Sequence, residues 1–169
     1  MLVSIDWLKE HYNDPTIVIF DTRPKPMFLY AHISKSQSLT IEQVIQFDQY
    51  GANPVADEKK IVTLFSSLGV DRSKTVVLIG ESMEPSAARI AWTFLYFGHE
   101  KTNLLDANIL DIQKNGFEFT KKLFIPKSTT FIPKIKSEIR IESVHLNDNL
   151  NNFVILDART PQEFMGGHL

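Results

Sequence analysis

Two Asp-x-Arg triplets, Asp21-Thr22-Arg23 and Asp157-Ala158-Arg159, carry the clearest chemical pattern in the sequence. Each triplet follows four apolar residues and precedes an aromatic residue and a histidine. A carboxylate two residues before a guanidinium can tie a loop together through charge-assisted hydrogen bonds, or it can serve as a catalytic accessory. The chain contains no cysteine, which excludes disulfides, thiolate metal sites and cysteine nucleophiles within it.

Other polar side chains give weaker signals. His32 and His168 each follow a small residue. Neither has a second metal-ligating residue at a spacing that is typical of metal sites. We therefore expect these histidines to orient loop backbone, and we expect neither a metal nor a cofactor. Ser82 and Ser86 lack a Gly-x-Ser-x-Gly motif and a base in register, and Ser86 is predicted to be a helix N-cap. Arg89 is interpreted either as a helix-to-sheet anchor or as an anion contact.

The triplets belong to an internal repeat with a constant offset of 136 residues and no gap. At this offset the apolar residues 17–20 align with 153–156, and His32 aligns with His168. Agreement of Asp, Arg, aromatic and His positions in one register indicates a duplication. The second copy stops about a quarter of the way through, so we expect a truncated chain.

The elements that must position these residues can be predicted from apolar spacing. Three continuous apolar runs predict strands that are covered on both faces. They span residues 17–20, 75–79 and 101–105. Helical spacing predicts a helix capped by Ser4 and further helices over residues 57–68 and 86–97, the last two followed by glycine. Strands that alternate with helices favour an α/β fold with a mainly parallel central sheet flanked by helices.

Charge and hydropathy exclude several functional classes. The chain has 18 Lys and Arg against 20 Asp and Glu, a formal net charge of -2, which rules out a generally basic nucleic-acid binder. No apolar run reaches the length of a membrane span, and the first ten residues do not form a signal peptide. We therefore expect a cytoplasmic location, with no nucleic-acid partner and no membrane partner.

The order of these motifs resembles the rhodanese-like family. The first half has a strand, Asp-x-Arg, an aromatic residue and His, and the second half has matching segments at 76–80, 87–92 and 97–100. The resemblance implies one rhodanese-like domain over residues 1–118, without a catalytic cysteine. It also implies the start of a second rhodanese-like domain over 138–169, truncated before its active-site loop. Between the two, the Lys-, Pro- and Ser/Thr-rich composition of residues 119–137 predicts an extended, solvated linker.

In tandem sulfurtransferases that this chain resembles, the first domain is usually inert and the second supplies the cysteine. Counting back along the family pattern places Gly80 at the nucleophile position of the first domain. The corresponding degenerate loop consists of Gly80, Glu81, Ser82, Met83, Glu84 and Pro85. Because Glu81 and Glu84 would repel an anion such as thiosulfate, we expect no sulfurtransferase site in this loop.

In the second unit, the resemblance implies accessory roles for four residues. These are Asp157, Arg159, Glu163 and His168. Some family members have an arginine in place of Glu163 and use it to hold the anionic substrate, so the preferred substrate is left open.

The function implied is that of a non-catalytic N-terminal part of a rhodanese-type sulfurtransferase. The complete protein would transfer sulfane sulfur from thiosulfate or 3-mercaptopyruvate to a thiophilic acceptor, through a cysteine persulfide located beyond this chain. This chain alone would be inactive for lack of a cysteine. The alternative is a non-catalytic rhodanese-like binding or regulatory module. Expected partners are a small anionic sulfur donor in the complete protein and a second copy of the chain, bound through the incomplete second domain.

Overall fold

The computed structural model describes residues 2–47, 53–81 and 84–166. The chain divides into two compact units, Met1–Lys136 (unit 1) and Ser137–Leu169 (unit 2), and each unit is described by itself. Within the described residues, no helix is both long enough and apolar enough to cross a membrane.

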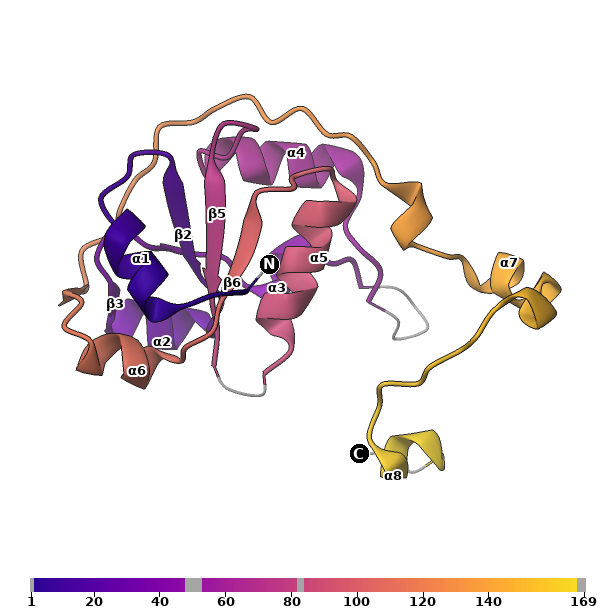
Figure 1. Ribbon diagram of the computed structural model, residues 1–169. Helices are drawn as coiled ribbons and strands as arrows, with labels where there is room; N and C mark the ends of the chain where they lie inside the picture. The colour runs from indigo at the N-terminus through magenta and orange to yellow at the C-terminus, as the bar shows by residue number, and fades with distance from the viewer. Residues whose placement is uncertain (1, 48–52, 82–83, 167–169) are drawn as a thin grey trace. The chain divides into compact units, whose positions relative to one another are not determined.

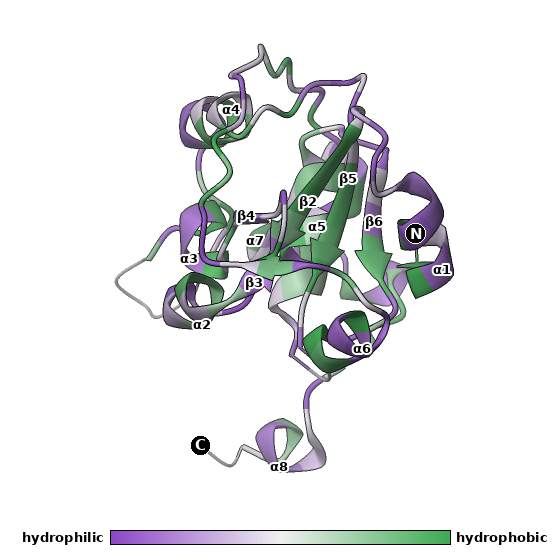
Figure 2. Cartoon of the chain, turned by 90° about the vertical axis from the view of Figure 1, so that its left-hand side faces the viewer, coloured by the Kyte–Doolittle hydropathy of each residue, from purple (hydrophilic) through white to green (hydrophobic). Residues whose placement is uncertain are grey.

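Unit 1 is built on a five-stranded parallel sheet in the order β1-β6-β5-β2-β4 (Figure 1). The strands are β1 (Leu2–Val3), β2 (Ile17–Asp21), β4 (Gln37–Ser38), β5 (Thr75–Ile79) and β6 (Thr102–Leu105). A separate antiparallel pair joins β3 (His32–Ile33) to β7 (Phe119–Thr120). The three strands predicted from apolar runs are confirmed and lie side by side, with hydrophobic residues along most of β2 and β5 (Figure 2).

Helices cover both faces of this sheet. The helices of unit 1 are α1 (Ile5–His11), α2 (Lys25–Tyr30), α3 (Ile41–Val44), α4 (Glu58–Ser67), α5 (Ser86–Tyr96) and α6 (Ile109–Lys114). Successive residues of a strand point to opposite faces. Accordingly, Val76 and Leu78 join the core cluster that contains residues of α4 and α5. Val77 and Ile79 join a second cluster, together with residues of α1 and α6. The predicted α/β fold with a parallel, helix-flanked sheet is confirmed.

The starts of α1 and α5 show where a serine in the sequence correctly predicts a helix N-cap and where it does not. Ser4 caps α1 as predicted, because its Oγ accepts a hydrogen bond from the backbone N–H of Trp7 at 3.1 Å. The prediction that Ser86 caps α5 is wrong, since Ser86 is the first residue inside the helix. Both its backbone N–H and its hydroxyl donate to the Glu84 carboxylate, at 3.1 and 2.6 Å. A carboxylate also suits the positive end of the helix dipole, so Glu84 takes the place expected for Ser86.

Residues 124–136, which we call the strap, run along unit 1. The segment is extended, as expected, but it is not merely a solvated linker. Phe131 is 2% exposed and belongs to the core cluster on the α4 and α5 face, with its ring 5.1 Å from that of Phe65. The strap also supplies backbone N–H groups to the ends of both helices. Thr129 donates to the carbonyl of Ser66, and Lys134 donates to that of Phe97.

Two glycines allow the strap to lie this close. Gly69 and Gly98 follow α4 and α5 with φ values of +75° and +84°, where glycine is strongly favoured. A Cβ at Gly98 would lie 2.4 Å from the carbonyl oxygen of Lys134, and one at Gly69 would lie 3.0 Å from that of Lys127. The last carbonyls of a helix lack partners within it, so the strap completes the ends of α4 and α5.

Unit 2 contains α7 (Ser143–Asp148), α8 (Pro161–Phe164) and two 3-10 turns, Ser137–Ile139 and Leu150–Asn152. At the repeat offset of 136, α7 overlaps the position of α1 and α8 overlaps that of α2. Residues 153–156 align with the start of β2, yet they pair with no strand among the described residues. Val154 and Leu156 are 90% and 88% exposed. Apolar sequence alone therefore does not make this segment a strand when β-partners are missing.

The strap generates a first prediction. Phe131→Ala should lower the free energy of unfolding of unit 1 by about 3–5 kcal/mol, because it removes a fully packed ring from the core. Ile132→Ala is the matched control, since Ile132 is 63% exposed and should change stability by less than about 0.5 kcal/mol. Urea denaturation measures both changes. Equal stabilities of the two variants would show that the strap does not belong to the core.

His99 generates a second prediction. The side chain is buried, with Nδ1 2.9 Å from the hydroxyl of Thr102 and Nε2 3.2 Å from the carbonyl oxygen of Asp71. Burial lowers the pKa of His99 and outweighs the opposing effects, of which the hydrogen bond with the backbone of Asp71 is the largest. In the unfolded chain the pKa returns to about 6.5. The unfolded state therefore binds more protons, and stability that is present above pH 6.5 is lost as the pH falls towards the folded pKa.

We expect the free energy of unfolding to fall below about pH 6.5, with a slope from His99 of at most about 1.4 kcal/mol per pH unit. His99→Gln should flatten this slope, whatever its effect on stability at pH 8. His145→Gln, at an exposed position in unit 2, is the control. Denaturation curves between pH 5 and 8 check the prediction, which fails if the His99 variant keeps the parent slope.

Candidate functional site

The carboxyl ends of β2, β5 and β6 meet at one edge of the sheet, where ligands of open α/β sheets commonly bind. A hollow of about 330 Å³ lies at this edge. Residues of the β5–α5 loop and of the β6–α6 connection form much of its wall. Its polar lining residues are Glu81, Glu84, Asp106, Asn108 and Asp111. Sequence reasoning identified Glu81 and Glu84 but missed the contribution of the β6–α6 connection.

The hollow is acidic. Four carboxylates line it, and no lysine or arginine does so within the described ranges. Two of the four are already engaged, since Glu84 binds the start of α5 and Asp111 accepts from the backbone N–H of Asn108 at 3.2 Å. No group of three or more metal-ligating side chains that could hold a metal ion occurs among the described residues. The like charges oppose binding of a small anion here.

Gly80 stands at the start of the loop, in a position with little room for a side chain. A Cβ added there would lie 2.9 Å from the Cβ of Ala87 and 3.2 Å from the Oγ1 of Thr22. Thr22 is held in place by a 3.0 Å hydrogen bond from its hydroxyl to the carbonyl of Ile79. Ala87 lies in the first turn of α5, so strand and helix together close the position. The other predicted loop residues Ser82 and Met83 lie outside the described residues.

The first Asp-x-Arg triplet is a buried ion pair. Arg23 donates from Nε to both oxygens of Asp21, at 3.0 and 3.1 Å, and from Nη2 to Oδ2 at 2.7 Å. Nη2 also donates to the carbonyl of Ala31, at 2.8 Å. The pair thus joins the end of β2 to the residue that follows α2. This geometry supports the structural interpretation of the triplet.

The second triplet has the same geometry on an exposed surface. Arg159 donates from Nε to both oxygens of Asp157 at 3.0 Å and from Nη2 to Oδ2 at 2.6 Å. Hydrogen bonds from Arg159 lower the pKa of Asp157, and the same pair raises the pKa of Arg159. Glu163 completes a capping box at the start of α8, where it accepts from the backbone N–H and hydroxyl of the N-cap residue Thr160. The hydroxyl of Thr160 is the main reason that the pKa of Glu163 is lowered.

The remaining candidates have local partners. His32 is buried, with Nδ1 2.8 Å from the carbonyl oxygen of Phe28 and Nε2 3.3 Å from that of Lys122. The carbonyl of Lys122 is in a loop, as expected, but that of Phe28 is in α2; His168 lies outside the described residues. Arg89 donates to the carbonyl of Asn53 and does not line the acidic hollow. This hydrogen bond joins α5 to the segment before α4, and the guanidinium also lies 5.0 Å from the centre of the Trp92 ring.

The sequence contains a pattern that indicates the lining residues of the β6–α6 connection. Asp106 directly follows a predicted strand, and Asn108 and Asp111 form a capping box at the start of α6. Residues that follow neighbouring parallel strands meet at one edge. The capping pattern directly follows the third predicted strand, and this indicates that Asp111 belongs to the same edge of the sheet.

Comparisons with known proteins agree with this geometry. Residues 4–115 match the rhodanese-like domain family. Over 98% of its length the chain is 26% identical to the sulfur carrier protein TtuD of Thermus thermophilus, of which it covers 60%. Over 96% of its length it is 24% identical to the 3-mercaptopyruvate sulfurtransferase of Escherichia coli, of which it covers 62%.

The fold comparison leads to the same group. The crystal structure of the 3-mercaptopyruvate sulfotransferase SseA from Escherichia coli matches 96% of this chain with a TM-score of 0.82 and 25% identity. The match covers 67% of that protein, and the chain spans about 60% of the length of the two curated relatives. With the family match covering most of its residues, this chain belongs to the rhodanese-like domain family.

Proposed function

We propose that this chain is the non-catalytic N-terminal part of a rhodanese-type sulfurtransferase whose reactive cysteine lies outside these 169 residues. The observation that carries the proposal is the closed position at Gly80. A side chain there would collide with Ala87, and the chain has no thiol to offer at any other position. The homology to sulfurtransferases supports the reaction class, and the acidic hollow supports an inert first unit.

The proposed chemistry requires a thiolate. A thiolate attacks the outer sulfur of thiosulfate, the S–S bond of the donor breaks, and sulfite leaves with the bonding electron pair. With 3-mercaptopyruvate the donor instead loses its sulfur as the C–S bond breaks, and pyruvate leaves after taking up a proton. The cysteine holds the sulfur as a persulfide until a thiophilic acceptor removes it and regenerates the thiolate. Glycine has no group that can form this bond.

Unit 2 would then supply the accessory residues of the site. Asp157 and Arg159 already form their ion pair, and Glu163 already completes the capping box of α8. Together with His168, they are proposed as accessory residues of the site once the remaining elements of a second domain are present. The donor would be thiosulfate or 3-mercaptopyruvate, and the acceptor a small thiophile.

The test compares the 169-residue chain with the full product of its gene in a thiosulfate:cyanide assay, and with 3-mercaptopyruvate as the alternative donor. The full product should turn over at least one donor and lose activity when its cysteine is replaced by serine. The 169-residue chain should show only buffer background, because it cannot form a persulfide. A full product that binds no sulfur and turns over neither donor would favour a binding or regulatory module instead.

A thiol placed in the loop tests the role of the acids. Gly80→Cys should remain near background in the same assay, because the contact with Ala87 strains the site and the carboxylates raise the thiol pKa. Gly80→Cys combined with Ala87→Gly relieves the contact. Adding Glu81→Gln and Glu84→Gln to that pair should speed alkylation of the single thiol by about two- to tenfold at pH 7.5. Robust turnover by Gly80→Cys alone would contradict this account.

Unit 2 generates a separate prediction about association. We expect the 169-residue chain to self-associate through residues 153–156, since exposed apolar side chains favour association. Sedimentation should show a mass that rises with concentration. Val154→Asp with Leu156→Asp should restore the monomer, whereas Leu110→Asp, at an exposed position of α6, should not. A parent chain that stays monomeric at all concentrations would contradict the prediction.

A further inference from the structure

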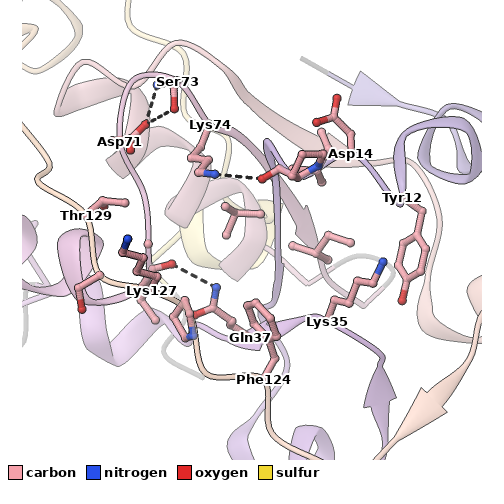
Figure 3. A pocket seen from close by; sticks show the side chains of 18 of the residues that line it. Tyr12, Asp14, Lys35, Gln37, Asp71, Ser73, Lys74, Phe124, Lys127 and Thr129 are labelled. Carbon is pink, nitrogen blue, oxygen red and sulfur yellow. Dashed lines mark hydrogen bonds between the residues drawn. The ribbon is translucent and has the colours of Figure 1, made fainter.

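A second cavity, of about 640 Å³, lies away from the carboxyl edge of the sheet (Figure 3). It exists because β4 is short. β4 pairs with β2 only opposite Phe20 and Asp21, so residues 17–19 have no strand on that side within the described ranges. Residues 126–129 of the strap form part of the opposite wall. The volume is in the range of small-molecule sites.

The cavity combines apolar walls with cations. Ile17, Val18, Leu68 and Phe124 supply apolar surface, and Lys35, Lys74 and Lys127 supply positive charge. None of these three lysines forms an ion pair within 4.0 Å in the part of the chain that is described. An apolar cavity with a few convergent polar groups is typical of ligand sites.

Two carboxylates also line the cavity, but local contacts hold both. Asp14 accepts from the backbone N–H and the hydroxyl of Thr16, and Asp71 accepts from those of Ser73. These hydrogen bonds lower the pKa of Asp14 and of Asp71, and the charge of Lys74 acts on both in the same direction. The carboxylates of Asp14 and Asp71 therefore partly balance the positive charge of Lys74. Lys35 and Lys127 are the cations left to attract an anion.

Lys35 is held in an unfavourable backbone conformation. It is the third residue of the turn 33–36, which is closed by a hydrogen bond from the N–H of Ser36 to the carbonyl of Ile33. Its φ of +69° is one that glycine or asparagine adopts at lower cost. The ammonium group is directed by the side chain of Asn13, at 2.7 Å, and lies 4.8 Å from the centre of the Tyr12 ring. Strained backbone conformations of this kind cluster at functional sites, and ligand sites are among them.

We propose that this cavity binds a small anion with an apolar body, of the medium-chain carboxylate class. The positive charges of Lys35 and Lys127 would attract the carboxylate, which would lie beside one of them, and the apolar tail would lie against Ile17, Val18 and Phe124. Figure 3 shows these two lysines on either side of Gln37 and Phe124. The site is separate from the acidic hollow, with which it shares no lining residue, and it requires no thiol.

Decanoate is the probe, and decanol is the uncharged control of matched chain length. In NMR titrations of the 169-residue chain, decanoate should shift the amide signals of residues 17–19, Lys35 and Thr129. Decanol should bind more weakly. Lys127→Gln should weaken decanoate binding by about two- to fivefold, as expected for a partly exposed ion pair. Lys101→Gln removes an exposed lysine outside the cavity and should change nothing.

Lys35→Gly provides the sharpest test, because stability and binding should change in different directions. The variant should weaken decanoate binding by a similar factor. It should also keep the parent Tm or raise it by up to about 4 °C, because the positive φ no longer carries a Cβ. The proposal is overturned if decanoate shifts only signals of unit 2, if decanol binds equally well, or if both lysine variants bind like the parent.

Discussion

The parallel pairing of β2 with β5, from Ile17 opposite Thr75 to Asp21 opposite Ile79, is the interaction on which unit 1 depends. The residues of β5 from Val76 to Ile79 are buried, so that each successive side chain enters the core on one face or the other. The register also determines where the two strands end. Asp21 and Ile79 finish side by side, and this brings Thr22 against Gly80. The closed position at Gly80 is therefore a consequence of this strand alignment.

Much of this framework could be predicted because it is encoded locally. Continuous apolar runs identified the three central strands, and Ser4 identified the start of α1. The two-residue strands β1 and β4 could not be predicted in this way, because tertiary pairing creates them without a pattern of their own. Phe131 was missed for a related reason. It is a single aromatic residue among lysines and prolines, and only the position of the strap shows that it fills a space beside Phe65.

The candidate site was predicted in part. Glu81 and Glu84 lie within the loop that follows β5, so their carboxylates could be assigned to it from the sequence. The contact between Gly80 and Ala87 depends on how closely a helix approaches a strand, which residue types do not indicate. The capping of α5 was misread because serine is the commoner cap. Here a carboxylate two residues earlier accepts from both the backbone N–H and the hydroxyl of Ser86.

The matching geometry of the two Asp-x-Arg pairs bears on the order of folding. One pair is buried under a complete sheet, whereas the other is exposed beside a segment without strand partners. Because the hydrogen bonds agree in both places, three residues suffice to form the turn, without long-range contacts. During synthesis, such a turn can form as soon as its residues leave the ribosome. The chain would then enter sheet assembly with its ion pairs already made, and would avoid bringing single charges into the core.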